Sequence, residues 1–200
     1  MTTKAQLDSI ISEFNLLNHP FYQAWHNGTL PVEALKVYAE EYGAFVGRVA
    51  EGWETTGDHS YADEERYHEQ LWVKFAATMG TTASKEGGLK ETRELMEVCS
   101  RLFGQYETAL GAMYAFEVQQ PDTAKSKIDG LRAHYNLGAD AEVYFEEHTA
   151  NHYEARTILE RMSRMTPAEQ QSSVDACREM CKAMWDVLSG IHGTCPAMVN

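Results

Sequence analysis

Residues 144–156 read Tyr144-Phe-Glu-Glu-His148-Thr-Ala-Asn-His152-Tyr-Glu-Ala-Arg156, and this stretch predicts a helix that carries two histidines. A spacing of four residues places both imidazoles on one face of such a helix, one turn apart. A hydrogen-bonded core histidine is the simpler explanation for either residue alone. Imidazole is a poor choice for filling an apolar helix face, so two in register require an explanation. The pair together favours a metal site in the core of a helical bundle.

The carboxylates that could complete this site come from two other segments. Glu65 lies three residues before His68 and Glu64 lies four before it, so either can share a helix face with this histidine. The charged neighbours of His68 also fit a solvated face. Glu117 stands in the apolar stretch 112–118, where a carboxylate is unfavourable unless it is paired, protonated or metal-bound. Histidines combined with two or three carboxylates suit iron or manganese better than zinc.

The composition is that of one globular domain spanning residues 1–200, with 44% hydrophobic and 24% charged residues. The net charge of -13 argues against nucleic acids and anionic membranes as partners. The sequence contains no apolar run of membrane-spanning length, and its polar start lacks the apolar core of a signal peptide, so we expect a cytoplasmic protein. The spacing of the cysteines matches no zinc pattern and indicates reduced thiols, namely Cys99, Cys177, Cys181 and Cys195.

Helical periodicity runs through almost the entire chain, and no clear alternating strand pattern occurs. The sequence therefore predicts an all-α, single-domain bundle of about seven helices. Thr166-Pro167-Ala-Glu169 is typical of a helix start, with a capping threonine and a proline at the first helical position. Short helical pieces at 7–14 and 21–26 precede the main predicted segments, which are 31–57, 61–79, 89–103, 104–120, 122–135, 139–165 and 167–190.

Short motifs spread over nearly the whole chain resemble one protein superfamily. They are Asn18-His-Pro-Phe-Tyr22-Gln-Ala-Trp25, Tyr38-Ala-Glu-Glu-Tyr42, His68-Glu-Gln-Leu-Trp72, Tyr114-Ala-Phe-Glu117-Val-Gln-Gln-Pro121, Lys127-Ile-Asp-Gly-Leu, Tyr144-Phe-Glu-Glu-His148 and Trp185-Asp-Val-Leu-Ser-Gly190. As a set, they resemble the TenA/PqqC-like superfamily with the heme-oxygenase fold. Within it, the chain is most similar to the CADD-like di-iron oxidases, which are para-aminobenzoate synthases.

This resemblance implies an oxidase that activates molecular oxygen at a metal centre and consumes a small molecule or its own side chains. By position, Tyr22 supplies the aromatic ring, Tyr38 is a second tyrosine near the site, and Lys127 supplies the amino group. The sequence pattern alone predicts structural roles for these three residues. Tyrosines in apolar segments usually pack in a core, and a lysine at helical spacing is most often a surface residue.

The resemblance also implies the metal ligands Glu65 (or Glu64), His68, Glu117 and His148, binding one or two iron ions, with manganese as the alternative. It further implies a homodimer. The family's last motif is histidine, three residues, aspartate, two residues, histidine, whereas this chain has His148, His152 and Ala155. We therefore expect His152 to act as a substitute ligand, and the number of ions stays open.

Other functions remain open because the motifs specify the fold better than the reaction. The alternatives are a PqqC-like oxidase without metal, a TenA-like thiamin-salvage enzyme, and a non-catalytic small-molecule-binding protein. The TenA-like reaction is disfavoured, because no cysteine lies near the Glu117 motif.

Overall fold

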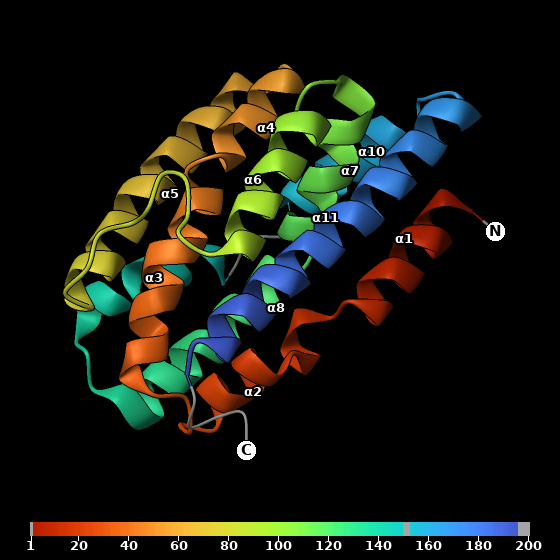
Figure 1. Ribbon diagram of the computed structural model, residues 1–200. Helices are drawn as coiled ribbons and strands as arrows, with labels where there is room; N and C mark the ends of the chain where they lie inside the picture. Colours follow the sequence, from red (N-terminus) through yellow and green to blue (C-terminus); the bar gives the residue numbers. More distant parts are fainter. Residues whose placement is uncertain (1, 150–152, 196–200) are drawn as a thin grey trace.

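Helices α7 (Tyr106–Glu117) and α11 (Pro167–Gly193) pack along each other in the middle of the bundle (Figure 1). The computed structural model describes residues 2–149 and 153–195. Gly111 lets the two helices approach closely, since a Cβ atom there would lie 2.0 Å from the carbonyl oxygen of Ser173. The close packing of α7 against α11 therefore requires glycine at position 111.

The other helices surround this pair, and the all-α prediction is confirmed: the described ranges contain only helices, turns and loops. Helix α1 lies against α11 on one side of the molecule, whereas α3, α4 and α5 form the opposite side (Figure 1). The remaining bounds are α1 (Thr3–Glu13), η1 (Leu16–Asn18), α2 (Pro20–His26), α3 (Val32–Val46), α4 (Val49–Thr55), α5 (His59–Thr78), α6 (Lys90–Leu102), α8 (Gln120–Gly130), η2 (Leu131–Tyr135), η3 (Ala139–Ala141), α9 (Val143–His148) and α10 (Tyr153–Met162).

Several segments predicted as single helices are divided in the structure. The predicted helix 31–57 is two helices, α3 and α4, separated by a tight turn at Gly47 and Arg48. Glycine has a low helix propensity, which favours the break at this point. The predicted helix 122–135 is α8 followed by the π-helical turn η2, and the predicted helix 139–165 corresponds to η3, α9 and α10, with residues 150–152 outside the described part.

The start of α11 follows the sequence prediction. The Thr166 hydroxyl accepts a hydrogen bond from the Glu169 backbone N–H at 3.4 Å, and the Glu169 carboxylate accepts one from the Thr166 N–H at 2.8 Å. Pro167 occupies the first turn, where its missing N–H has no intrahelical partner to lose. This reciprocal pair is a capping box, which fixes where the helix begins.

An aromatic core fills the space between α2, α3, α5 and α9. Trp25 and Phe75 stack with ring centroids 6.4 Å apart, and the edge of Phe145 meets Phe75 at 5.1 Å. Trp72 contacts Tyr38 from α3 at 5.4 Å. These rings bury large apolar areas and hold the four helices in fixed register, which positions the polar groups described below.

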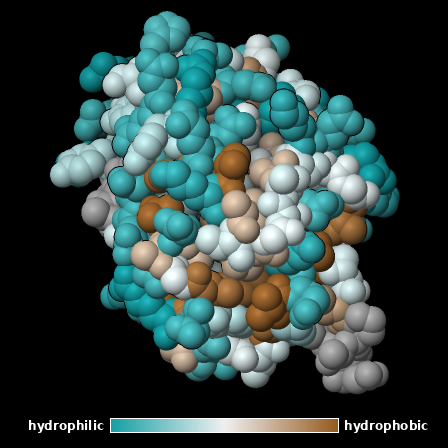
Figure 2. All heavy atoms as spheres, turned by 90° about the vertical axis from the view of Figure 1, so that its left-hand side faces the viewer, coloured by the Kyte–Doolittle hydropathy of each residue, from teal (hydrophilic) through white to brown (hydrophobic). Residues whose placement is uncertain are grey.

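The surface is mainly hydrophilic, with apolar groups gathered in the middle and lower parts of the face shown in Figure 2. Two large side chains of α5 contribute exposed apolar area, Tyr67 at 48% and Val73 at 52%. The four cysteines are buried and free, as expected for reduced thiols. Among the described helices, none combines the length and apolar character that crossing a membrane requires.

Candidate metal centre

Three of the predicted ligands come together in the core, Glu65 and His68 from α5 and His148 from the end of α9. Each offers one ligand atom, and these atoms all lie within 4.8 Å of one another. Spacing of three residues puts Glu65 and His68 on the inward face of α5, where they are 5% and 2% exposed. The alternative carboxylate, Glu64, is exposed. The geometry therefore selects Glu65 over Glu64 as the candidate ligand.

His148 presents one unprotonated ring nitrogen to the interior of the bundle. Its Nδ1–H donates a hydrogen bond to the carbonyl oxygen of Tyr144 at 2.6 Å, so the unprotonated nitrogen is Nε2. This Nε2 is buried and has no hydrogen-bond partner among the described residues. Burial, and then the nearby charge of His68, lower the pKa of His148 to about 3, so the ring is neutral at physiological pH. A neutral imidazole fixed by its other nitrogen is a typical metal ligand.

Glu65 and His68 form a hydrogen-bonded pair, with His68 Nδ1 3.1 Å from Glu65 Oε1. Burial disfavours protonation of His68, but the hydrogen bond and charge of Glu65 outweigh it and raise the pKa of His68. The second oxygen of Glu65, Oε2, is buried without a partner among the described residues. Two orphaned acceptors, Glu65 Oε2 and His148 Nε2, are what a bound cation would satisfy. The residues therefore fit a metal ion such as iron.

Glu117, the fourth predicted ligand, is buried at the end of α7 but lies outside the 4.8 Å group. The indole N–H of Trp53 donates a hydrogen bond to Glu117 Oε1 at 3.1 Å. Burial raises the pKa of Glu117 well above its usual value, and the charges of Glu65 and Glu154 raise it further. Of the three grouped residues, Glu65 is thus the one whose charge acts on Glu117. The fifth predicted ligand, His152, lies outside the described residues.

A second polar cluster contains the three residues predicted to be catalytic. Lys127 on α8 is 4% exposed, so its side chain is buried, not at the surface as its pattern alone indicates. Its Nζ lies 4.8 Å from the ring centroid of Tyr22, 5.7 Å from that of Tyr38 and 5.2 Å from that of Phe145. Among the described carboxylates, none forms an ion pair with it. Burial lowers the pKa of Lys127 to about 7.

Tyr22 and Tyr38 are joined through their hydroxyls, which are 3.1 Å apart. Burial is the main reason why the pKa values of both phenols are raised, so both keep their protons at neutral pH. A neutral phenol pair beneath an amine of lowered pKa is an enclosed, weakly charged environment. The structure thus brings Tyr22, Tyr38 and Lys127 together.

Aromatic rings connect this cluster to the candidate metal centre. Tyr144 lies 4.4 Å from the ring of His148 and 4.7 Å from that of Trp72, measured between centroids. Trp72 in turn contacts Tyr38. Gln120 Nε2 donates a hydrogen bond to the Tyr144 hydroxyl at 3.3 Å. From the sequence we expected only a packing role for Trp72 and Tyr144. Gln120 was not predicted to be part of the site, because nothing in the residues around it indicates that its side chain is buried.

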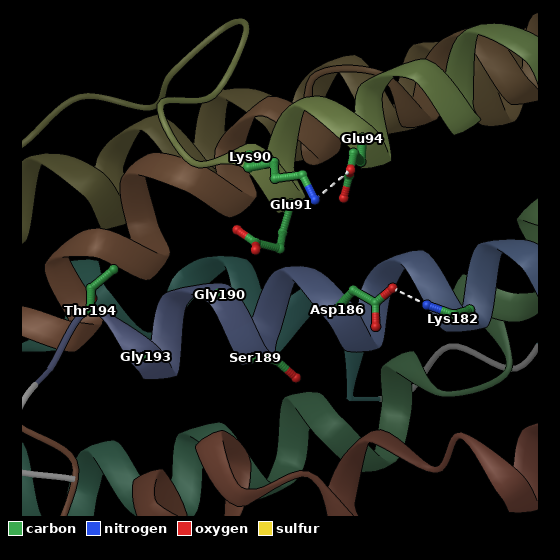
Figure 3. Close-up of a pocket in the computed structure, with 9 residues that line it drawn as sticks. All are labelled: Lys90, Glu91, Glu94, Lys182, Asp186, Ser189, Gly190, Gly193 and Thr194. Carbon is green, nitrogen blue, oxygen red and sulfur yellow. Dashed lines mark hydrogen bonds and ion pairs between the residues drawn. The ribbon is translucent and has the colours of Figure 1, made fainter. Parts of the chain in front are cut away.

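A surface hollow of about 660 Å³ lies between α6 and α11 (Figure 3). Lys90 and Glu94 form an exposed ion pair across 3.1 Å on one side of it, and Lys182 pairs with Asp186 on the other. Exposed ion pairs contribute little energy and are satisfied by each other. This hollow contains neither of the orphaned buried acceptors, so the buried groups, and not the hollow, are the candidate site.

Comparisons with known proteins concern the family and the fold. The family model described as iron-containing redox enzyme matches residues 20–185. A 4-aminobenzoate synthase from Nitrosomonas europaea is 34% identical, in an alignment that covers 96% of this chain and 91% of that protein.

Solved structures show the same fold at lower identity. A TenA homolog from Pseudomonas syringae pv. tomato superposes with a TM-score of 0.78 at 15% identity, covering 95% of this chain and 92% of that one. A CADD-like protein of unknown function from Nostoc punctiforme gives a TM-score of 0.66 at 18% identity, with coverage of 94% and 92%. The predicted TenA- and CADD-like helical fold is confirmed.

Proposed function

The chain belongs to the family of iron-containing redox enzymes, and we propose that it forms 4-aminobenzoate by oxidising its own Tyr22 with nitrogen from Lys127. Membership of that family follows from the match over residues 20–185. The self-consuming reaction is supported by one observation. The amine of Lys127 is buried over the ring of Tyr22, at 4.8 Å, in a core that also contains a metal-binding set of side chains.

The arrangement of atoms in the product supports tyrosine as its source. In 4-aminobenzoate the nitrogen and the carboxyl carbon stand para to each other, as the hydroxyl and Cβ do in tyrosine. Conversion forms a bond between the ring carbon and Lys127 Nζ in place of the bond to the phenolic oxygen, and it breaks the Cε–Nζ bond, so that Cε is left as an aldehyde and water is released. The Cα–Cβ bond of Tyr22 is also cleaved, and Cβ is oxidised to a carboxylate. Molecular oxygen is the oxidant for both parts of the conversion.

Lys127 is suited to act as the nitrogen donor because its amine is partly unprotonated at neutral pH. A lysine with an ordinary pKa of 10.5 is almost fully protonated there, whereas a pKa of about 7 leaves about half of the amines with a free lone pair. The aromatic rings around it exclude water and orient the amine toward the Tyr22 ring. Tyr38 holds the Tyr22 hydroxyl in place through their 3.1 Å contact.

Glu65, His68 and His148 would hold the metal, whose chemistry when bound is the activation of oxygen. His148 is kept in the required tautomer by the carbonyl of Tyr144, and His68 is oriented by Glu65. Tyr144 and Trp72 fill the space between these ligands and Tyr38. They exclude water from it and are the oxidisable rings that lie between the centre and the proposed substrate.

Isotope labelling tests the proposal directly. The protein is produced with ¹³C in the tyrosine rings and ¹⁵N at the lysine side chains, purified without oxygen, loaded with ferrous or manganous ions, and exposed to oxygen with a reductant. We expect 4-aminobenzoate that carries both labels, in an amount no greater than that of the protein. Peptides covering residues 22 and 127 should change in mass at the same time.

Matched variants identify the residues involved. Tyr22→Phe and Lys127→Arg should abolish the labelled product. Two control variants should leave it unchanged: Tyr106→Phe, which alters an exposed tyrosine on α7, and Lys125→Arg, which alters an exposed lysine on the same helix as Lys127. Undiminished product from Tyr22→Phe, or product lacking the protein's label, would refute the self-consuming reaction and favour an external substrate.

A further inference from the structure

The longest connection between helices in the described ranges, residues 79–89, joins α5 to α6 on the outer side of α3 (Figure 1). We call residues 80–89 the strap. Gly80 ends α5 with a φ of 66°, and Gly87 has a φ of 78° shortly before α6 begins. Residues with a Cβ atom rarely adopt such angles, so the strap is bounded by two glycine turns.

Glu41 of α3 binds the end of the strap from the side. Its carboxylate is 6% exposed and accepts hydrogen bonds from the backbone N–H groups of Gly88 at 2.9 Å and Leu89 at 3.1 Å. Leu89 is the residue before α6, and no side chain of its own segment caps this helix. Glu41 therefore supplies from another helix both the cap of α6 and an attachment for the strap.

The rest of the strap is attached by few contacts. The Ser84 N–H donates a hydrogen bond to the backbone carbonyl of Glu40 at 2.9 Å, and the Thr81 hydroxyl donates one to the Glu40 carboxylate at 3.2 Å. Its apolar contribution to the core consists of Ala83 and Leu89, which are only partly buried. A segment with few buried apolar contacts opens locally at a low free energy, without unfolding of the whole domain.

The strap covers the indole of Trp72. A Cβ atom on Gly43 would lie 2.7 Å from the Cβ of Ala83 and 2.8 Å from Nε1 of Trp72, so glycine at this position lets the strap approach the indole edge. Trp72 is 1% exposed and contacts both Tyr38 and Tyr144. Ala83 thus lies between the surface and the aromatic core that surrounds the site.

A hollow of about 330 Å³ opens beside the strap, between α3 and α5. Gly43 and Ala83 line it, together with Val73, which is 52% exposed. The hollow and Trp72 therefore share two neighbours, Gly43 and Ala83. Movement of Ala83 away from Gly43 would join the hollow to the core.

The proposed reaction requires such an opening, because its product forms in an enclosed space. Tyr22, Tyr38 and Lys127 are at most 4% exposed. We propose that the strap is the gate through which 4-aminobenzoate leaves, past Trp72 and into the hollow, and that Glu41 is the latch that holds this gate closed. This inference rests on the proposed function and adds to it the route of the product.

Hydrogen exchange of the unreacted wild type, without metal or oxygen, tests the opening itself. The hydrogen-bonded amides of Ser84, Gly88 and Leu89 should exchange at rates that low concentrations of urea leave unchanged, whereas core amides of α7 and α11 should exchange faster as urea is added. Exchange of the strap amides only together with the core amides, with the same dependence on urea, would overturn the gate.

Two variants test the latch. Glu41→Gln weakens the hydrogen bonds to a charged acceptor, so the strap amides should exchange at least about tenfold faster, while core amides far from α3 keep their rates. Glu86→Gln, which neutralises an exposed carboxylate within the strap, should leave the exchange rates unchanged. Equal rates in Glu41→Gln and the wild type would exclude Glu41 as the latch.

Product release connects the opening to the reaction. After exposure to oxygen, rapid gel filtration separates bound from free 4-aminobenzoate. Both proteins should form the same amount, and Glu41→Gln should release it at least about fivefold faster than the wild type. Equal release rates despite faster exchange in the strap would overturn the gate and leave the oxidase intact. If Glu41→Gln does not fold, Thr81→Val takes its place and should speed exchange and release about threefold, since it loses one hydrogen bond to Glu40; unchanged rates of both would overturn the gate.

Failure of the proposed function has a different result. Absence of 4-aminobenzoate from the wild type and the variants alike would refute the reaction and, with it, the route of the product. Local opening of the strap and its control by Glu41 would still be decided by hydrogen exchange, which requires neither metal nor product.

Discussion

Replacing Lys127 with methionine should stabilise the protein most at low pH. Lys127 is 4% exposed and lies over aromatic rings, where its charge loses the solvation that water provides. Methionine has a similar length, packs well against aromatic rings and carries no charge. Lys127→Met therefore removes the unfavourable burial of a cation while it leaves the aromatic core filled.

The size and sign of the effect follow from the pKa of Lys127, which burial lowers from 10.5 to about 7. Below about pH 7 the lysine is protonated in both the folded and the unfolded states, so the folded protein bears the full penalty of about 5 kcal/mol, at about 1.4 kcal/mol per pKa unit. Between about pH 7 and 10.5 the folded state has lost the proton and the unfolded state has kept it. The wild type therefore gains about 1.4 kcal/mol of stability per pH unit across this window.

Urea unfolding of the metal-free proteins measures this difference. From about pH 6 to about pH 9, the stability advantage of Lys127→Met over the wild type should shrink by about 3 kcal/mol. Other titrating groups are common to both proteins and cancel. Lys125→Met, at an exposed position of the same helix, should show an advantage or deficit that does not change with pH. An advantage of Lys127→Met that is constant with pH would refute the lowered pKa, and with it the neutral amine on which the proposed nitrogen transfer depends.

Three further changes test the fold and the contacts of the site. Gly111→Ala should destabilise the protein by about 3 kcal/mol or more in thermal or urea unfolding, because its Cβ would meet the Ser173 carbonyl, and Gly193→Ala, with open space around it, should change stability by less than about 1 kcal/mol in either direction; equal effects would contradict the close approach of α7 and α11. Tyr144→Phe should lower stability by about 1 kcal/mol, since Gln120 loses its partner, and should slow 4-aminobenzoate formation; an unchanged rate would exclude a role for the hydroxyl. Thr166→Ala should lower stability by about 1 kcal/mol without changing metal content, and no loss of stability would contradict the capping box.

The fold was largely predictable because helical periodicity and caps are local signals. The all-α class, the start of α11 at Thr166 and the buried thiols all follow from patterns within a few residues. The breaks within the predicted helices were harder to predict from the sequence. The turn at Gly47 depends on how α3 and α4 pack against α5, which no single segment encodes.

The candidate metal centre was likewise predictable only in part. The three-residue spacing predicted that Glu65 and His68 share one face of α5. Glu117 was predicted to be buried because it is the one carboxylate in an apolar stretch. The burial of Lys127 was not predictable from its own helix, because the apolar rings that cover it come from α2, α3 and α9. The family resemblance singled out Lys127 as a site residue, whereas its local sequence pattern predicted an exposed side chain.

The burial of Glu154 was not predicted, because residues 139–165 were expected to form one continuous helix. In one unbroken helix at 3.6 residues per turn, Ala155 would follow His148 by almost two full turns and share its face, and Glu154 would point elsewhere. The structure ends α9 at His148 and gives α10 its own register, in which Glu154 points inward with Ile158 and Met162. The four-residue spacing of these three was present in the sequence and would have signalled the inward carboxylate.

The acidic centre and the buried lysine act on each other through the aromatic core. The charge of Lys127 is one of the causes that lower the pKa of His148, so a proton on the lysine disfavours a positive charge at this candidate ligand. By reciprocity, a cation bound at this ligand disfavours the proton on Lys127 and lowers its pKa further below about 7. Metal loading would thus increase the fraction of neutral amine, which is the form of Lys127 that the proposed nitrogen transfer requires.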